Sequence, residues 1–372
     1  MKRSHARAFQ KDDLFLRLPK DCEEKILDYF TLQELCRGLA PCSSRTRDLV
    51  YAPKHWRRIS IRGMRNDHAV SLLRLHGRAI ERIRADSMRA SRAFCDRLMG
   101  CKGLQELDLR GIWKSPAVNN RFVSAISSLP LRVLLFGKNE LGATGFQRLC
   151  HSLAGSLEEL DFNSTTLPLR AYYQLVKLRR LRSLTLRCCS QVDQSLLPFL
   201  GILERLSSLQ LSFLPRLSGA AVASIADSGL CKQLQTLVLN GMYLSEHHCF
   251  ELNKLRSLRT LSVCHPNIDS RALQRLSLPN LGLLTIFCSK YLDSFEFLRR
   301  LPCLKMLCLY RCAVSVRSMQ ETARACPRVD FKVFMPRKIR AFGVEVSDEE
   351  LDLAAHPNIS HLNLMSRPYP FV

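Results

Sequence analysis

The fold follows from a short repeated pattern, of which Leu181-Arg182-Ser183-Leu184-Thr185-Leu186 is a clear copy. Its apolar residues follow the spacing L-x-x-L-x-L, and the last two leucines alternate with polar residues as in a half-buried β-strand. The same spacing returns roughly every 23 to 28 residues. Further copies begin at Leu104, Leu131, Leu157, Leu206, Leu234, Leu258, Leu281 and Leu304.

A helical stretch follows most of these short strands, so each copy is one strand–helix unit. One unit cannot bury its apolar edge alone, whereas stacked units share a continuous core. Weaker copies at Ile80, Val329–Val333 and Ile359 flank the clear ones, as expected for the capping ends of an array. The chain resembles the ribonuclease-inhibitor and cysteine-containing classes of leucine-rich repeat over roughly residues 56–365. The resemblance implies an α/β fold, a horseshoe-shaped leucine-rich-repeat solenoid of about 11–13 repeats over 59–365.

The composition indicates a globular, intracellular protein. Of 372 residues, 47% are hydrophobic and 24% charged, and no apolar run approaches the ~18–20 residues of a membrane helix. The basic tail 1–13 lacks the apolar core of a secretory signal. Mitochondrial presequences are poor in acidic residues, and no acidic residue precedes Asp12, so a mitochondrial presequence stays an open alternative. The 16 cysteines include no C-x-x-C pair, and Cys189 and Cys312 follow strands where they can bond the turn backbone. We therefore expect buried free thiols and a cytoplasmic or nuclear location.

Residues 14–58 do not follow the repeat and predict a small helical module. Pro19 suits the first turn of a helix, and Ile26, Leu27 and Phe30 recur with helical spacing. Trp56 is expected to join this module to the first strand of the solenoid.

The module resembles an F-box, because Leu18-Pro19, Ile26-Leu27, Glu34-Leu35, Cys42 and Pro53-x-x-Trp56-x-x-Ile59 match that motif in order and spacing. It departs from the pattern at Pro41, where valine is usual, and at Thr46, where a bulky aromatic residue is common. F-box proteins with leucine-rich repeats are substrate receptors of Skp–cullin–F-box ubiquitin ligases. The resemblance implies that the module docks the Skp adaptor through Leu18, Pro19, Ile26, Leu27, Phe30 and Leu35. The alternative is that these residues only cap the first repeat.

The residues that flank the last two leucines of each repeat should point out of the concave sheet. Along the chain they change from acidic through neutral to apolar and aromatic. We expect the protein substrate to contact this face at Arg187, Asn240, Leu283, Phe287, Met306 and Tyr310. Alternatively, the C-terminal tail 366–372 folds back over the apolar end.

The formal charge of +23 predicts an acidic or phosphate-bearing partner. Much of the excess lies just before the strands, so stacking should align it along one rim. The rim residues are Arg179, Arg180, Arg182, Arg256, Arg259, Arg299, Arg300 and Lys305. Favourable contacts of cations with helix C-termini explain some of them. The rim could therefore bind nucleic acid or an acidic or phosphorylated protein.

No sequence motif for catalysis is present. We find no G-x-x-x-x-G-K-[ST], G-x-G-x-x-G or H-E-x-x-H, and the adjacent pair His247-His248 points in two directions. We therefore expect no enzyme activity, cofactor or metal, and no membrane partner. The leading hypothesis is a substrate receptor that binds the Skp adaptor, a cullin and a protein substrate. The alternatives are a basic scaffold in a ribonucleoprotein or organellar complex and, more weakly supported, an inhibitor-type protein that grips an enzyme.

Overall fold

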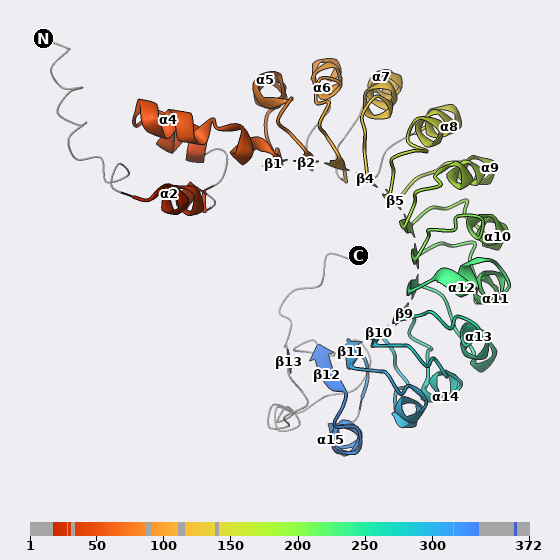
Figure 1. Ribbon diagram of the computed structural model, residues 1–372. Helices are drawn as coiled ribbons and strands as arrows, with labels where there is room; N and C mark the ends of the chain where they lie inside the picture. The colour runs from red at the N-terminus through yellow and green to blue at the C-terminus, as the bar shows by residue number, and fades with distance from the viewer. Residues whose placement is uncertain are drawn as a thin grey trace, which may run out of the picture.

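The computed structural model describes residues 18–27, 29–30, 34–85, 91–110, 116–137, 141–314, 316–334 and 361–362. Within these residues the chain forms a curved arc, with short strands along the inner side and helices along the outer side (Figure 1). The strands make one parallel sheet of 13 strands in which neighbours follow the chain order. This arrangement confirms the prediction of an α/β solenoid of leucine-rich type.

The strands are β1 (Arg58–Ser60), β2 (Arg82–Arg84), β3 (Glu106–Asp108), β4 (Val133–Phe136), β5 (Glu159–Asn163), β6 (Ser183–Arg187), β7 (Ser208–Ser212), β8 (Thr236–Asn240), β9 (Thr260–Cys264), β10 (Leu283–Phe287), β11 (Met306–Tyr310), β12 (Asp330–Phe334) and β13 (His361–Leu362). The N-terminal helices are α2 (Lys20–Leu27), η2 (Leu35–Leu39), α4 (Ser44–Val50) and η3 (Pro53–Trp56). The outer helices are α5 (Asn66–His76), α6 (Arg92–Leu98), α7 (Pro116–Ser127), α8 (Ala143–Ser152), α9 (Leu169–Tyr172), η4 (Tyr173–Lys177), η5 (Gln194–Leu196), α10 (Leu197–Leu200), α11 (Ala220–Ala226), α12 (Leu230–Gln233), α13 (Glu246–Leu252), α14 (Ser270–Gln274), η6 (Glu296–Arg300) and α15 (Val316–Ala325).

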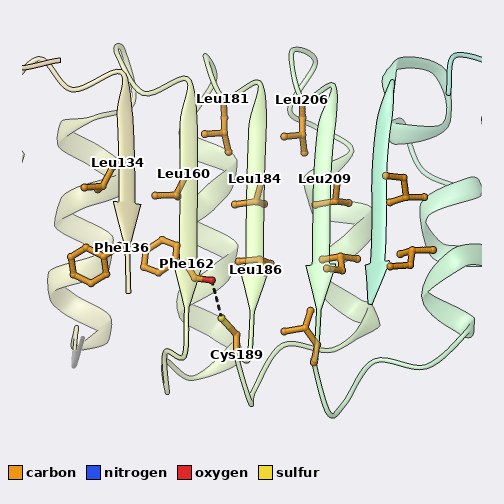
Figure 2. Packing of buried hydrophobic residues seen from close by; sticks show 14 of the residues in the cluster. Leu134, Phe136, Leu160, Phe162, Leu181, Leu184, Leu186, Cys189, Leu206 and Leu209 are labelled. Carbon is orange, nitrogen blue, oxygen red and sulfur yellow. Dashed lines mark hydrogen bonds between the residues drawn. The ribbon is translucent and has the colours of Figure 1, made fainter. Parts of the chain in front are cut away.

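The repeated leucines form continuous tiers inside the solenoid. Leu184 of β6 is in register with Leu160 of β5 and Leu209 of β7, and all three are fully buried (Figure 2). Burial of each such side chain away from water stabilises the folded protein by about 1.5–3 kcal/mol. Because the tiers continue from strand to strand, each repeat depends on its neighbours for its core.

A left-handed turn follows most of the five-residue strands. Positive φ angles occur directly after them at Ser164, Cys188, Phe213, Gly241, Cys288 and Arg311. The next residue turns back beneath the sheet, where the Cys189 thiol donates to the carbonyl of Phe162 at 3.8 Å (Figure 2). Cys312 donates in the same way to the carbonyl of Ile286 at 3.3 Å. These buried thiols bond the backbone between repeats, as expected, and all 16 cysteines are free.

The N-terminal helices pack onto the first repeat. Trp56 is buried, donates from Nε1 to the carbonyl of Val50 at 2.8 Å, and stacks on His76 with ring centroids 3.8 Å apart. Thr46 closes a capping box at the start of α4, since Thr46 N–H donates to Ser43 Oγ and Ser43 N–H donates to Thr46 Oγ1. Capping explains the threonine at a position where the F-box pattern often has an aromatic residue. In the part of the chain that the structure describes, no helix has the length and apolar character to cross a membrane.

Candidate functional site

The concave face of the sheet carries three chemically different sections. The charged section lies on β2 to β5, the polar section on β6 to β9, and the aromatic section on β10 to β12. The parallel register places equivalent side chains of neighbouring strands next to each other. The sequence-based expectation of a gradient from acidic to aromatic is therefore met, except that the first section also holds arginines.

In the charged section, arginines and acids pair across strands. Arg82 forms an ion pair with Glu106. Arg110 lies between two carboxylates, with Nη2 3.0 Å from Asp108 Oδ2 and Nη1 3.6 Å from Asp161 Oδ2. Burial raises the pKa of Asp161 above its ordinary value, and the positive charge of Arg110 only partly opposes this. These contacts largely satisfy the charges internally.

The polar section contains Arg187 and Asn240, both half-buried on the concave side. They flank Ser212 in one row across β6, β7 and β8. Asn240 donates from Nδ2 to Ser212 Oγ at 3.2 Å, whereas its Oδ1 atom has no hydrogen-bond partner. This amide oxygen is itself buried, so it is an unsatisfied acceptor beneath the surface of the polar section.

The aromatic section consists of three stacked rings at the ends of neighbouring strands. Phe287, Tyr310 and Phe334 are in register, with ring centroids 4.6 Å and 4.2 Å apart. Leu283 and Met306 begin the same strands, so two half-buried apolar side chains lie at the opposite end of this surface. A rigid row of aromatic rings with adjacent Leu and Met is typical of the core of a protein interface.

The basic rim lies where the chain enters the strands. Backbone bonds from Gly282 N to Arg259 O (2.8 Å) and from Lys305 N to Gly282 O (2.9 Å) stack these positions in successive repeats. All eight rim residues are exposed. Arg300 donates to the carbonyl of Gln274 at the end of α14 (3.0 Å), and Arg179 donates to that of Ile202 (3.4 Å). Helix-end contacts therefore account for these two cations.

The other six rim cations differ in whether an acidic side chain lies close to them. Arg182 lies 4.0 Å from Glu158, whose carboxylate also interacts with Arg180. Among the described residues, no acid lies within 4.0 Å of the cationic groups of the remaining four, which are Arg256, Arg259, Arg299 and Lys305. These four cations form the uncompensated part of the rim, beside Leu283 and Met306.

The predicted adaptor-binding residues divide into exposed and buried ones. Pro19 is exposed and Phe30 is 39% exposed, whereas Leu18 and Ile26 are half-buried. Leu27 and Leu35 lie in the hydrophobic core. For these two residues the prediction of direct contact is corrected, because their side chains pack inside the module and support its surface from beneath.

Sequence reasoning missed three residues at these surfaces. Tyr29, next to Phe30, is 89% exposed, and its size and position in an apolar run could have identified it. Phe334 completes the aromatic row, but it lies in a blurred repeat. Arg82 lies in a degenerate early repeat, where the leucine spacing gave no reliable register. The tail 366–372, expected as an alternative cover for the aromatic section, lies outside the described residues.

The described part of the chain has no group of three His, Cys, Asp or Glu side chains that could hold a metal ion. His248 has a structural role, because its Nδ1 accepts from the backbone N–H of Ser245 at 3.1 Å and so caps α13. Its neighbour His247 lies apart from it, with ring centroids 5.9 Å apart. His248 therefore serves local structure.

No protein-family model matches the sequence, and no curated protein matches it. Among solved structures, one match is titled "Crystal structure of Rad7 and Elc1 complex in yeast". The identity is 15% over 90% of this chain and 89% of that chain, with a TM-score of 0.47. The functional proposal therefore depends on the surfaces and the sequence motifs of this chain.

Proposed function

We propose that this chain is a non-catalytic, protein-binding receptor that carries two separate surfaces on one rigid arc. The aromatic section holds a protein substrate, and the N-terminal module docks an adaptor. The observation that carries this proposal is the stacked row of Phe287, Tyr310 and Phe334, which is pre-organised by the sheet. Rigid aromatic anchors lose little conformational entropy when a partner binds.

The resemblance to an F-box supports a more specific form of the proposal. In this form the module binds the Skp adaptor of a cullin-based ubiquitin ligase, and the solenoid presents the substrate. Pro19, Tyr29 and Phe30 offer exposed apolar surface on the module. Trp56 and His76 stack at its junction with the repeats, which would keep the two surfaces at a fixed separation. Such a receptor would act by holding its substrate close to the loaded conjugating enzyme, inside the cell, without a catalytic residue of its own.

The test is co-purification of the Skp adaptor and cullin with tagged full-length protein. We would compare wild type with the Leu18→Ala/Pro19→Ala and Tyr29→Ala/Phe30→Ala variants. Phe250→Ala is the matched control, because Phe250 is an exposed aromatic residue on α13, far along the arc. We expect both module variants to lose the adaptor and the control to retain it. Wild-type protein that recovers no adaptor would reject the ligase form of the proposal.

A scaffold in a ribonucleoprotein is the second candidate, and the four uncompensated rim cations favour it. Phosphate contacts make RNA binding salt-dependent. Each lost contact to single-stranded RNA reduces the magnitude of the negative slope of log K, the logarithm of the association constant, against log salt by about 0.7. Arg256→Gln/Arg259→Gln should therefore weaken RNA binding and reduce that slope. Arg74→Gln/Arg78→Gln removes two exposed cations near α5 and is the control. Equal RNA binding by both double variants would rule out the rim as an RNA site.

A further inference from the structure

Two cysteines meet where the aromatic section begins. Cys264 is the last residue of β9, and its register partner on β10 is Phe287, so Cys288 is its diagonal neighbour. A strand separation of about 4.8 Å and a Cα step of about 3.8 Å place such neighbours about 6 Å apart. Disulfides span Cα distances of about 4.4–6.8 Å. The backbone therefore brings the two residues within bonding range.

The two thiols already interact, and their surroundings make them different. The Cys264 side chain hydrogen-bonds Cys288, and Arg311 adds positive charge beside Cys288. The hydrogen bond from Cys264 and this charge outweigh burial and lower the pKa of Cys288 to about 6. The same hydrogen bond, together with burial, raises the pKa of Cys264. The hydrogen bond and the charge of Arg311 therefore favour the thiolate form of Cys288, with Cys264 as the thiol that donates to it.

Cys288 directly follows Phe287, the last residue of β10. It adopts the left-handed conformation with φ 60°, which is uncommon for a residue other than glycine, and donates its N–H to the Tyr310 carbonyl at 2.8 Å. Both Cys264 and Cys288 are half-buried, so a small reagent can reach them. Cys312, the third thiol nearby, is buried and donates to the carbonyl of Ile286.

Cys188 provides a comparison within the same chain. It also adopts the left-handed conformation directly after a strand, with φ 50°, and it is exposed. The register partner of Arg187 is Asn163, so an amide occupies the place that Cys264 has beside Cys288. Two repeats thus share one turn geometry, but only one supplies a second thiol.

We propose that Cys264 and Cys288 form a reactive dithiol site that hydrogen peroxide converts to a disulfide. The Cys288 thiolate attacks one peroxide oxygen, the O–O bond breaks, and the hydroxide released takes up a proton to become water. Cys288 is then a sulfenic acid. Cys264 gives up its proton, its sulfur attacks Cys288, and the S–O bond breaks with release of a second water. Two thiols are oxidised by two electrons, and one peroxide is reduced to two waters. The site does not depend on the proposed receptor function.

The test uses the reduced full-length protein, treated with hydrogen peroxide, alkylated and digested with trypsin for mass spectrometry. Cleavage after Arg259, Arg271, Arg275 and Lys290 places Cys264 and Cys288 in separate peptides, 260–271 and 276–290. We expect these two peptides to be cross-linked in wild type and in the Cys188→Ser control. We expect no cross-link in either Cys264→Ser or Cys288→Ser. Cys264→Ser should leave a sulfenic acid on Cys288 that dimedone traps, and Cys288→Ser should leave Cys264 as the thiol.

A second measurement on wild-type protein avoids any effect of substitution on folding. At pH 6, Cys288 should react with iodoacetamide about tenfold faster than an ordinary thiol, because its larger thiolate fraction outweighs its lower intrinsic nucleophilicity. The Cys188 thiol in the same sample is the reference. Absence of the 260–271 to 276–290 cross-link under peroxide would overturn the proposal. So would reaction of Cys288 at or below the rate of Cys188.

Discussion

Tyr310 stacks face to face on Phe334, with ring centroids 4.2 Å apart and an angle of 2° between the ring planes. Phe287 covers the other face of Tyr310 at 4.6 Å. The three rings occupy the same register position on β10, β11 and β12, so the ladder itself sets their spacing. Tyr310 is the centre of the aromatic section.

Replacement of Tyr310 by alanine removes both stacks. We expect a loss of about 1–3 kcal/mol in the free energy of unfolding, since each aromatic pair contributes about 0.5–1.5 kcal/mol. If the aromatic section is the substrate anchor, affinity for the substrate should also fall at least tenfold. Urea unfolding measures the first effect. Tyr310→Phe keeps the ring, so a loss of equal size in that variant would show that stacking is not the cause.

Leu184→Ala should destabilise the protein by about 3 kcal/mol, because it opens a cavity in a fully buried tier. Unfolding in urea, followed by circular dichroism, gives this value. Leu75→Ala is the control, since Leu75 is 68% exposed on α5 and should change stability by less than about 0.5 kcal/mol. Similar losses of stability in both variants would contradict the burial of Leu184 in its tier.

Gly241 occupies the left-handed turn after β8 at φ 81°. A Cβ atom there would lie 3.1 Å from Phe213 Cδ1, in addition to the backbone cost. Gly241→Ala should therefore cost about 1–2 kcal/mol in stability. Thermal unfolding measures this loss. In that experiment Gly155→Ala should be nearly neutral, because no heavy atom lies within 4 Å of the new Cβ. A neutral Gly241→Ala would show that this turn is not constrained.

The pH dependence of stability should report on Asp161. Its pKa is higher in the folded protein than in the unfolded chain, because burial disfavours the charge. The folded state therefore binds the proton more tightly, and the contribution of Asp161 to stability falls as pH rises through and above about 4. Relative to wild type, Asp161→Asn should gain stability between pH 4 and pH 7, measured by urea unfolding at each pH. Glu159→Gln, on the exposed part of the same strand, is the control, and a pH-independent difference for Asp161→Asn would refute the prediction.

Leucine spacing predicted the solenoid well because burial acts on every repeat in the same way. Once Leu184 and Leu209 point inward, alternation places Thr185 and Gln210 on the concave side. The same rule identified Phe287 and Tyr310 as neighbours. It failed at Phe334, because the residues of β12 lack the leucine pattern that fixes the register elsewhere.

Contacts between charged side chains could not be predicted from the same pattern. Arg300 and Arg259 look alike in sequence, but Arg300 reaches the carbonyl of Gln274 and Arg259 has no acid nearby. Burial of Leu27 and Leu35 likewise depends on how the N-terminal helices pack. The positions of long side chains and the packing of the N-terminal helices depend on tertiary contacts. The spacing of the leucines does not encode these contacts.

The most direct test of the receptor proposal is the affinity of the purified full-length protein for purified Skp adaptor, measured by isothermal titration calorimetry. We expect saturable binding by wild type and at least tenfold weaker binding by Tyr29→Ala/Phe30→Ala. We expect unchanged binding by Tyr310→Ala, whose substitution lies in the aromatic section. No measurable binding by wild type, or equal binding by all three proteins, would contradict the assignment of the N-terminal module as the adaptor-docking surface.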